Sequence, residues 1–206
     1  MRPPTAIVLS NMHKFKRYLW LSQVNLFAWL LLSSVLASSV VFTNGGVSNY
    51  GNHYNTVLFY SVAFLAGAFY LYLAAESLLL LSARFKNLAR YLNILCVLML
   101  LVFVTTFPRR FGMVFSDIHD NVSKLLFGYE FLLVIWLAYK RPTLETLGYT
   151  LIMITGSLIG LLSSMHKLNL MFVGQMSGAL GFALLLVFVL PKVIGKELGK
   201  TSKKSA

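Results

Sequence analysis

Six long apolar stretches constrain this chain more than any other feature of its sequence. They cover approximately residues 18–42, 56–81, 91–107, 122–139, 143–162 and 168–190. A bilayer hydrocarbon core about 30 Å thick needs roughly 20 helical residues to cross it. Membrane-barrel strands alternate in polarity and are about 10 residues long, so continuous apolar runs of this length exclude a barrel. We therefore predict an all-α, polytopic membrane protein, a six-helix transmembrane bundle forming a single domain.

The composition excludes a water-soluble protein and disfavours a nucleic-acid-binding one. With 58% hydrophobic and 12% charged residues, the chain has too little polar surface to coat a soluble globule. Its net charge of +12 does not form a basic, aromatic-interleaved face, because the cations bracket the apolar stretches. We expect no nucleic-acid partner and take anionic lipid headgroups as the counter-charge.

The distribution of positive charge predicts the orientation. In a six-pass topology, four of the 18 Lys and Arg residues fall on one side, which leaves 14 on the other. Those four are Arg109, Arg110, Lys124 and Lys167. Because positive residues are retained in the cytoplasm, both termini are predicted to be cytoplasmic, in a multi-pass protein of a bacterial plasma membrane. The basic tail, 191–206, is expected to adhere to anionic headgroups of the inner leaflet.

Small residues in the last two apolar stretches predict a close helix contact. Gly156 and Gly160 are four residues apart, as are Gly174 and Gly178, and Gly181 follows. Such spacing lets two membrane helices approach closely. The contact is either between these two helices or between two copies of the chain. A homo-oligomer and a membrane-protein partner both stay open.

Polar residues gather in the predicted outer loops. His53, His119 and His166 each lie in a different outer loop, and Asp117 and Asp120 flank His119. Ser116 or Asp117 is expected to cap the helix that follows. Three imidazoles and a carboxylate suffice for a zinc site with an open water position, which could hydrolyse a lipid ester or amide. However, the spacing matches no known ligand motif, so we predict no cofactor and leave metal binding open.

Glu130 interrupts the fourth apolar stretch. Ionisable groups at membrane depth are costly unless they face the bundle interior or water, so they often mark functional positions. Pairing within the structure and a functional role are about equally expected for Glu130. If Glu130 and Gln175 lined a path across the bundle, the protein would be a small solute or ion transporter.

Three short segments resemble a known family. They are Val47-Ser-Asn-Tyr-Gly51, Ser116-Asp-Ile-His-Asp120 and Gly174-Gln175. The chain resembles bacterial domain-of-unknown-function relatives of the DRAM-like (damage-regulated autophagy modulator) six-helix membrane proteins. That resemblance implies a six-helix bundle whose functional residues lie mainly in the outer loops. The eukaryotic relatives of this family are associated with membrane trafficking and lipid handling. The positions it singles out are Ser48, Gly51, Asp117, His119 and Gln175.

The sequence thus favours a non-enzymatic membrane factor that binds a lipid or a partner through an outward-facing polar pocket. The expected ligand-binding residues are Ser48, Gly51, His53, Asp117, His119, Asp120, Glu130, His166 and Gln175. The two alternatives are a metal-dependent intramembrane lipid hydrolase and a small transporter.

Overall fold

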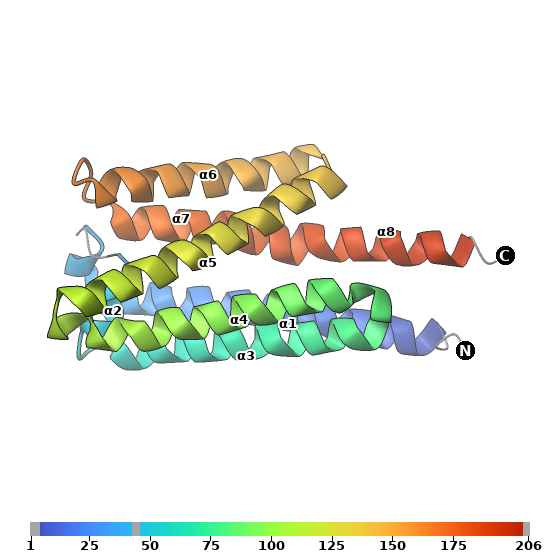
Figure 1. Ribbon diagram of the computed structural model, residues 1–206, viewed down its shortest axis with the longest axis horizontal. Coiled ribbons are helices and arrows are strands. Elements are labelled where there is room, and N and C mark those ends of the chain that lie inside the picture. Colours follow the sequence, from blue (N-terminus) through green and yellow to red (C-terminus); the bar gives the residue numbers. More distant parts are fainter. Residues whose placement is uncertain (1–4, 43–45, 204–206) are drawn as a thin grey trace.

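A computed structural model of the protein describes residues 5–42 and 46–203, which contain helices and turns and no strand (Figure 1). The long helices are α1 (Thr5–Leu36), α3 (Val57–Leu81), α4 (Lys86–Thr106), α5 (Met113–Lys140), α6 (Leu144–Ser164), and α7 (Met171–Leu184) with its continuation α8 (Leu190–Lys203). The short helix α2 (Asn49–Asn52) lies between α1 and α3. Six helices in the described chain are long and apolar enough to span a membrane. The predicted all-α polytopic bundle is confirmed.

Several helices extend beyond their apolar stretches. Helix α1 begins at Thr5 instead of near residue 18, and α8 continues to Lys203 instead of ending near residue 190. Helix α5 begins at Met113 instead of near residue 122. Gly112 separates α5 from the preceding turn, since its φ of 147° suits glycine and would strain other residues. Ser116 and Asp117 therefore lie inside the helix, and the expectation that either would cap it is wrong. The tail also begins as helix α8, although its last residues, 204–206, lie outside the described part.

Helices α1, α3 and α4 form one packed group (Figure 1). Small residues bring their backbones close, and side chains then reach across to neighbouring carbonyls. The Ser22 hydroxyl on α1 donates to the Gly67 carbonyl of α3 at 2.8 Å. The Cys96 thiol on α4 donates to the Ala68 carbonyl at 3.1 Å. Polar side chains thus act as interhelical contacts in the middle of the membrane.

Helices α6 and α7 form a second group that packs backbone against backbone. A Cβ added at Gly156 would lie 2.2 Å from the backbone nitrogen of Gly178. One added at Gly174 would lie 2.4 Å from the nitrogen of Gly160. These separations are possible only for glycine, so the predicted close packing of the last two apolar stretches is confirmed within a single chain.

Helix α5 crosses diagonally between the two groups (Figure 1). Its 28 residues span about 42 Å, more than a hydrocarbon core of about 30 Å, and a tilt accommodates the excess. We call the end of the bundle that carries α2 the loop end. The opposite end, with the α5–α6 corner, the start of α1 and the end of α8, is the basic end. The charge distribution predicts that the basic end faces the cytoplasm.

Candidate functional site

Three segments far apart in the sequence meet at the loop end. The Ser48 hydroxyl, just before α2, lies 2.7 Å from Nε2 of His119 on α5. The backbone N–H of Val47 donates to Oε1 of Gln175 on α7, also at 2.7 Å. These are the three segments that carried the family resemblance, so the structure brings Ser48, His119 and Gln175 into one polar cluster.

The tautomer of His119 follows from its neighbours. The Thr105 hydroxyl on α4 has a single proton, which it gives to the Leu101 carbonyl at 2.7 Å. Thr105 must then accept from Nδ1–H of His119, 3.1 Å away. This leaves Nε2 as an acceptor, so the Ser48 hydroxyl donates to it. We call Ser48, Thr105 and His119 the hydroxyl–imidazole network.

A hydroxyl that donates to an imidazole is the geometry of an activated nucleophile, yet access argues against that use here. Ser48 is 8% exposed and His119 only 2%, so a substrate carbonyl could reach the hydroxyl only if the segment around α2 moved. The group that orients the ring is a neutral threonine and not a carboxylate. In this state the network joins α2 to α4 and α5 and presents no nucleophile to solvent.

The approach of α2 to the bundle depends on Gly51. A Cβ there would lie 2.6 Å from Cγ2 of Thr106 and 2.7 Å from the Tyr60 ring. Thr106 and Tyr60 are themselves fixed by a 2.8 Å hydrogen bond between their hydroxyls. The Asn52 amide donates to the Thr106 carbonyl at 3.2 Å. Gly51 is thus a close-packing position, and its predicted role in ligand binding stays a prediction.

The contact with Gln175 requires a second glycine. Gly46 has a φ of 63°, in the left-handed region that glycine adopts readily. A Cβ at this position would lie 2.4 Å from Oε1 of Gln175. The backbone can therefore present the Val47 N–H to Gln175 only because residue 46 has no side chain.

Tyr50 belongs to α2, and its side chain is fully buried. Its ring meets that of Phe172 edge to face, with centroids 5.3 Å apart. Its hydroxyl has no hydrogen-bond partner within the described chain. Burial raises the pKa of Tyr50 to about 12, so the hydroxyl stays protonated at physiological pH.

Residues 52–55, which are the last residue of α2 and the turn that follows it, are exposed and uncharged. We call these four residues the turn 52–55. Tyr54 is 84% exposed, and its ring stacks on that of His53 with centroids 5.8 Å apart. Buried residues hold both ends of the turn: Gly51 packs as described, and the Thr56 hydroxyl donates to the Tyr50 carbonyl at 2.7 Å. The turn is thus an ordered polar surface.

Asp117, Asp120 and Glu130 make no hydrogen bond to the cluster among the residues that the structure describes. Asp117 and Asp120 are exposed on α5, and Asp120 lies 4.0 Å from the Arg109 guanidinium. His166 is exposed in the α6–α7 turn. Glu130 is partly buried further along α5, with no hydrogen bond or ion pair within the described residues. Among those residues, no three His, Cys, Asp or Glu side chains are placed to hold a metal ion.

Sequence reasoning missed Thr105, Thr106 and Tyr60, which complete the cluster. The available signal was the pair of adjacent threonines at the end of the third apolar stretch. Hydroxyls at a span end need acceptors, and both threonines donate to carbonyls of their own helix. A polar side chain from another helix then contacts each of them, His119 at Thr105 and Tyr60 at Thr106. Neighbouring polar residues at a span end are therefore worth including in a site prediction.

Comparison with known proteins adds no assignment. No protein-family model matches this chain, and no curated protein or solved structure matches it. The resemblance to DRAM-like proteins therefore rests on the three short segments that meet at the loop end.

Proposed function

We propose that this chain is a non-enzymatic membrane protein that binds a membrane lipid through the exposed turn at the loop end. The observation that carries the proposal is that residues 52–55 are exposed while Gly51 and Thr56 at either side are buried and fixed. A surface ordered before binding loses little conformational entropy when a ligand arrives.

The chemistry of the turn suits a lipid headgroup. The Asn55 amide can both donate and accept hydrogen bonds, and the Asn52 amide keeps its oxygen and one N–H beside its bond to Thr106; neither carries charge. Tyr54 adds an amphipathic ring of the kind that favours the headgroup region. The hydroxyl–imidazole network supports a binding role over catalysis, because its groups are buried and satisfied by each other.

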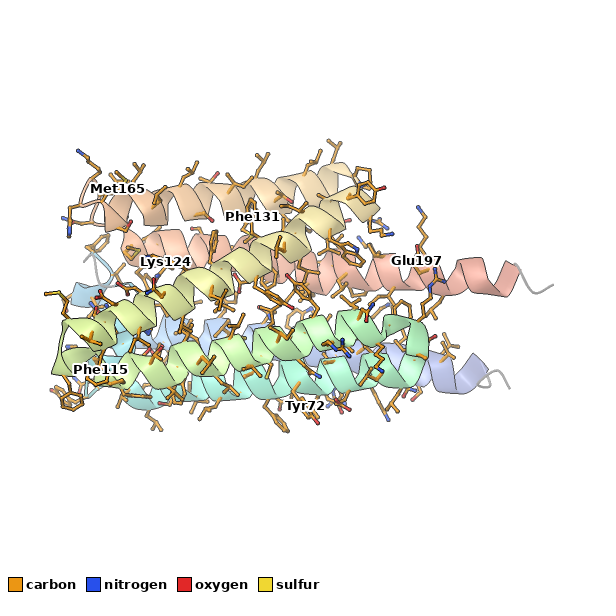
Figure 2. The ribbon with its side chains drawn as sticks, in the orientation of Figure 1. Tyr72, Phe115, Lys124, Phe131, Met165 and Glu197 are labelled. Atoms are coloured by element: carbon orange, nitrogen blue, oxygen red, sulfur yellow. The ribbon has the colours of Figure 1, made fainter. Side chains whose placement is uncertain are left out.

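The test is lipid retention in the turn variant Tyr54→Ala/Asn55→Ala. The protein is extracted into mild detergent, and co-purified lipid is counted by native mass spectrometry. We expect less retained lipid than in the wild type. The matched control is Tyr72→Ala, which removes an exposed ring from the outer surface of α3 (Figure 2) and should leave retention unchanged.

Three outcomes would contradict the proposal. Equal retention in the wild type and the turn variant would exclude the turn as the lipid site. Loss of a co-purifying membrane protein instead of lipid would assign the turn to a partner. Hydrolysis of lipid by the wild type that disappears in His119→Ala would show that the protein is an enzyme.

A further inference from the structure

The basic end contains a cleft that the loop-end proposal does not involve. It has a volume of about 430 Å³, within the range of roughly 300–1,000 Å³ typical of small-ligand sites. The α5–α6 corner forms one wall and α8 forms the other. Its polar lining consists mainly of Lys140, Arg141, Thr143, Lys192, Lys196 and Glu197. We call this feature the basic cleft.

The sequence Lys140-Arg-Pro-Thr143 creates the first wall. Pro142 disfavours helical geometry at Arg141, which adopts φ −145° and ends α5. Thr143 then caps α6 by accepting from the N–H of Thr146 at 3.3 Å. The cleft is thus bordered by two cationic side chains and by the N-terminus of a 21-residue helix, whose dipole favours an anion.

A proline also shapes the second wall. Pro191 has no N–H to continue the helix ladder, and a π-helical turn, Leu185–Val189, lies immediately before α8. Beyond it, Lys192 and Lys196 are four residues apart and therefore share one helix face. Lys192 reaches the α5–α6 side, where its Nζ lies 2.7 Å from both carboxylate oxygens of Glu145.

Positive charge exceeds negative charge around the basic cleft. Lys140, Arg141, Lys192 and Lys196 line it, and Arg84 contacts it through a 2.6 Å ion pair with Glu197. Figure 2 shows Glu197 on α8 at this end of the bundle. Glu145 and Glu197 are the two carboxylates in this group, so the five cationic side chains leave three positive charges in excess.

Arg141 supplies the second indication of a ligand. Its Nε–H is buried and has no hydrogen-bond partner in the described part of the chain. A buried donor without an acceptor is costly, and such groups are rare in native structures. A guanidinium is matched best by a planar or tetrahedral oxyanion that accepts two of its N–H groups together.

We propose that the basic cleft binds the phosphate group of an anionic phospholipid from the adjacent leaflet. A lipid is favoured over a soluble phosphate because large exposed apolar side chains flank the corner. Tyr139 is 81% exposed and Leu144 is 89% exposed, one on each side of the turn. The phosphate sits among Arg141, Lys196 and the α6 N-terminus, while the acyl chains lie along these apolar groups. Basic pockets between membrane helices recognise anionic headgroups in this way.

The experiment compares retention of phosphatidylglycerol and phosphatidylcholine by the full chain. The protein is reconstituted in nanodiscs that contain both lipids, released gently, and analysed by native mass spectrometry. We expect the wild type to retain phosphatidylglycerol preferentially. In Arg141→Gln/Lys196→Gln we expect this preference to fall at least about tenfold, because each lost charge-assisted contact is worth roughly a tenfold change in affinity.

The control removes the same charge elsewhere at the basic end. Lys14 and Lys16 are exposed on α1 and do not line the cleft, so Lys14→Gln/Lys16→Gln should keep the wild-type preference. An equal fall in both double variants would show that bulk charge, not the cleft, attracts the lipid. An unchanged preference in the cleft variant would overturn the site. If inorganic phosphate displaced the lipid at matched concentration, the ligand would be the free anion instead. The result is independent of the turn 52–55, so this proposal and the loop-end proposal can fail separately.

Discussion

The two ends of the bundle use their polar groups in opposite ways. At the loop end, hydroxyls, an imidazole and an amide hydrogen-bond to one another, as in the 2.7 Å contact between Ser48 and His119, while the buried Tyr50 hydroxyl lacks a partner in the described chain. At the basic end, positively charged side chains surround a cleft, and the buried Nε–H of Arg141 lacks a partner in the described chain. Neutral donors and acceptors can pair internally, whereas like charges cannot. The two ion pairs at the basic end leave an excess of positive charge around the cleft, and we propose that an anion from outside the chain balances it.

The largest expected effect comes from Gly156→Ala, which disturbs both ends together. Helices α6 and α7 carry Glu145 to one end and Gln175 to the other, and the new Cβ would lie 2.2 Å from the Gly178 nitrogen. Backbone cannot move aside as a flexible side chain can, so we expect a loss of about 3 kcal/mol of unfolding free energy. The measurement is unfolding in mixed micelles by circular dichroism.

Gly178→Ala is the matched control for this change. Its Cβ would have its nearest neighbours at 3.7 Å, an ordinary contact distance. Stability should therefore be preserved or slightly raised, since alanine is the better helix former. Equal destabilisation by the two substitutions would show that α6 and α7 are not packed as described.

His119→Ala tests whether the loop end can be destabilised without affecting the basic end. It leaves Ser48 and Thr105 without their shared partner and opens a cavity, so we expect a loss of about 2 kcal/mol. Amide hydrogen exchange should accelerate at residues 47–52 and stay unchanged at the α5–α6 corner. The Ser123 hydroxyl lies 3.4 Å from Nε2 of His119, a weaker contact than that of Ser48. Ser123→Ala is therefore the control, with an expected change within about 0.5 kcal/mol. Faster exchange at the basic end in His119→Ala would show that the ends are coupled.

Gln175→Ala tests a single hydrogen bond at the loop end. The Val47 N–H loses its 2.7 Å acceptor, which should cost about 1 kcal/mol. Exchange should accelerate at Val47 without reaching the hydroxyl–imidazole network. Gln175→Glu keeps an acceptor oxygen at an exposed position and should restore the wild-type exchange rate. A failure of that restoration would argue against the hydrogen bond itself.

Glu145→Gln is expected to have the smallest effect on stability. It tests the proposed anion binding at the basic end, which the loop end does not share. The Lys192–Glu145 pair is partly exposed, so its loss should change stability by less than about 1 kcal/mol. It also releases Lys192 toward the basic cleft. We expect stronger retention of phosphatidylglycerol, with the gain shrinking as salt is raised. Weaker retention would mean that Glu145 organises the cleft rather than competing with its ligand.

The fold was predictable because hydrophobicity alone identifies membrane helices. The ends of the helices were less predictable than their presence. The first turns of α5 lie outside the apolar stretch, because backbone hydrogen bonds continue beyond the hydrocarbon core. The glycine pattern predicted the α6–α7 contact because only glycine permits backbone contact at that distance.

The candidate site was predictable only in part. Ser48, His119 and Gln175 were singled out and do meet, but His53, Asp117 and His166 are exposed outside the network. Hydropathy places a residue at one end of a bundle without showing which face it occupies. For the same reason, the α8 lysines were taken as part of a tail, since nothing in their spacing showed that Lys192 would reach Glu145.

The most direct test of the difference between the ends is hydrogen exchange of the wild type in neutral and in anionic nanodiscs. We predict that anionic lipid slows exchange at residues 139–145 and 192–197 and leaves residues 46–56 unchanged. Slower exchange at the loop end, or no change at the basic end, would contradict a closed polar cluster at one end and an open anion site at the other.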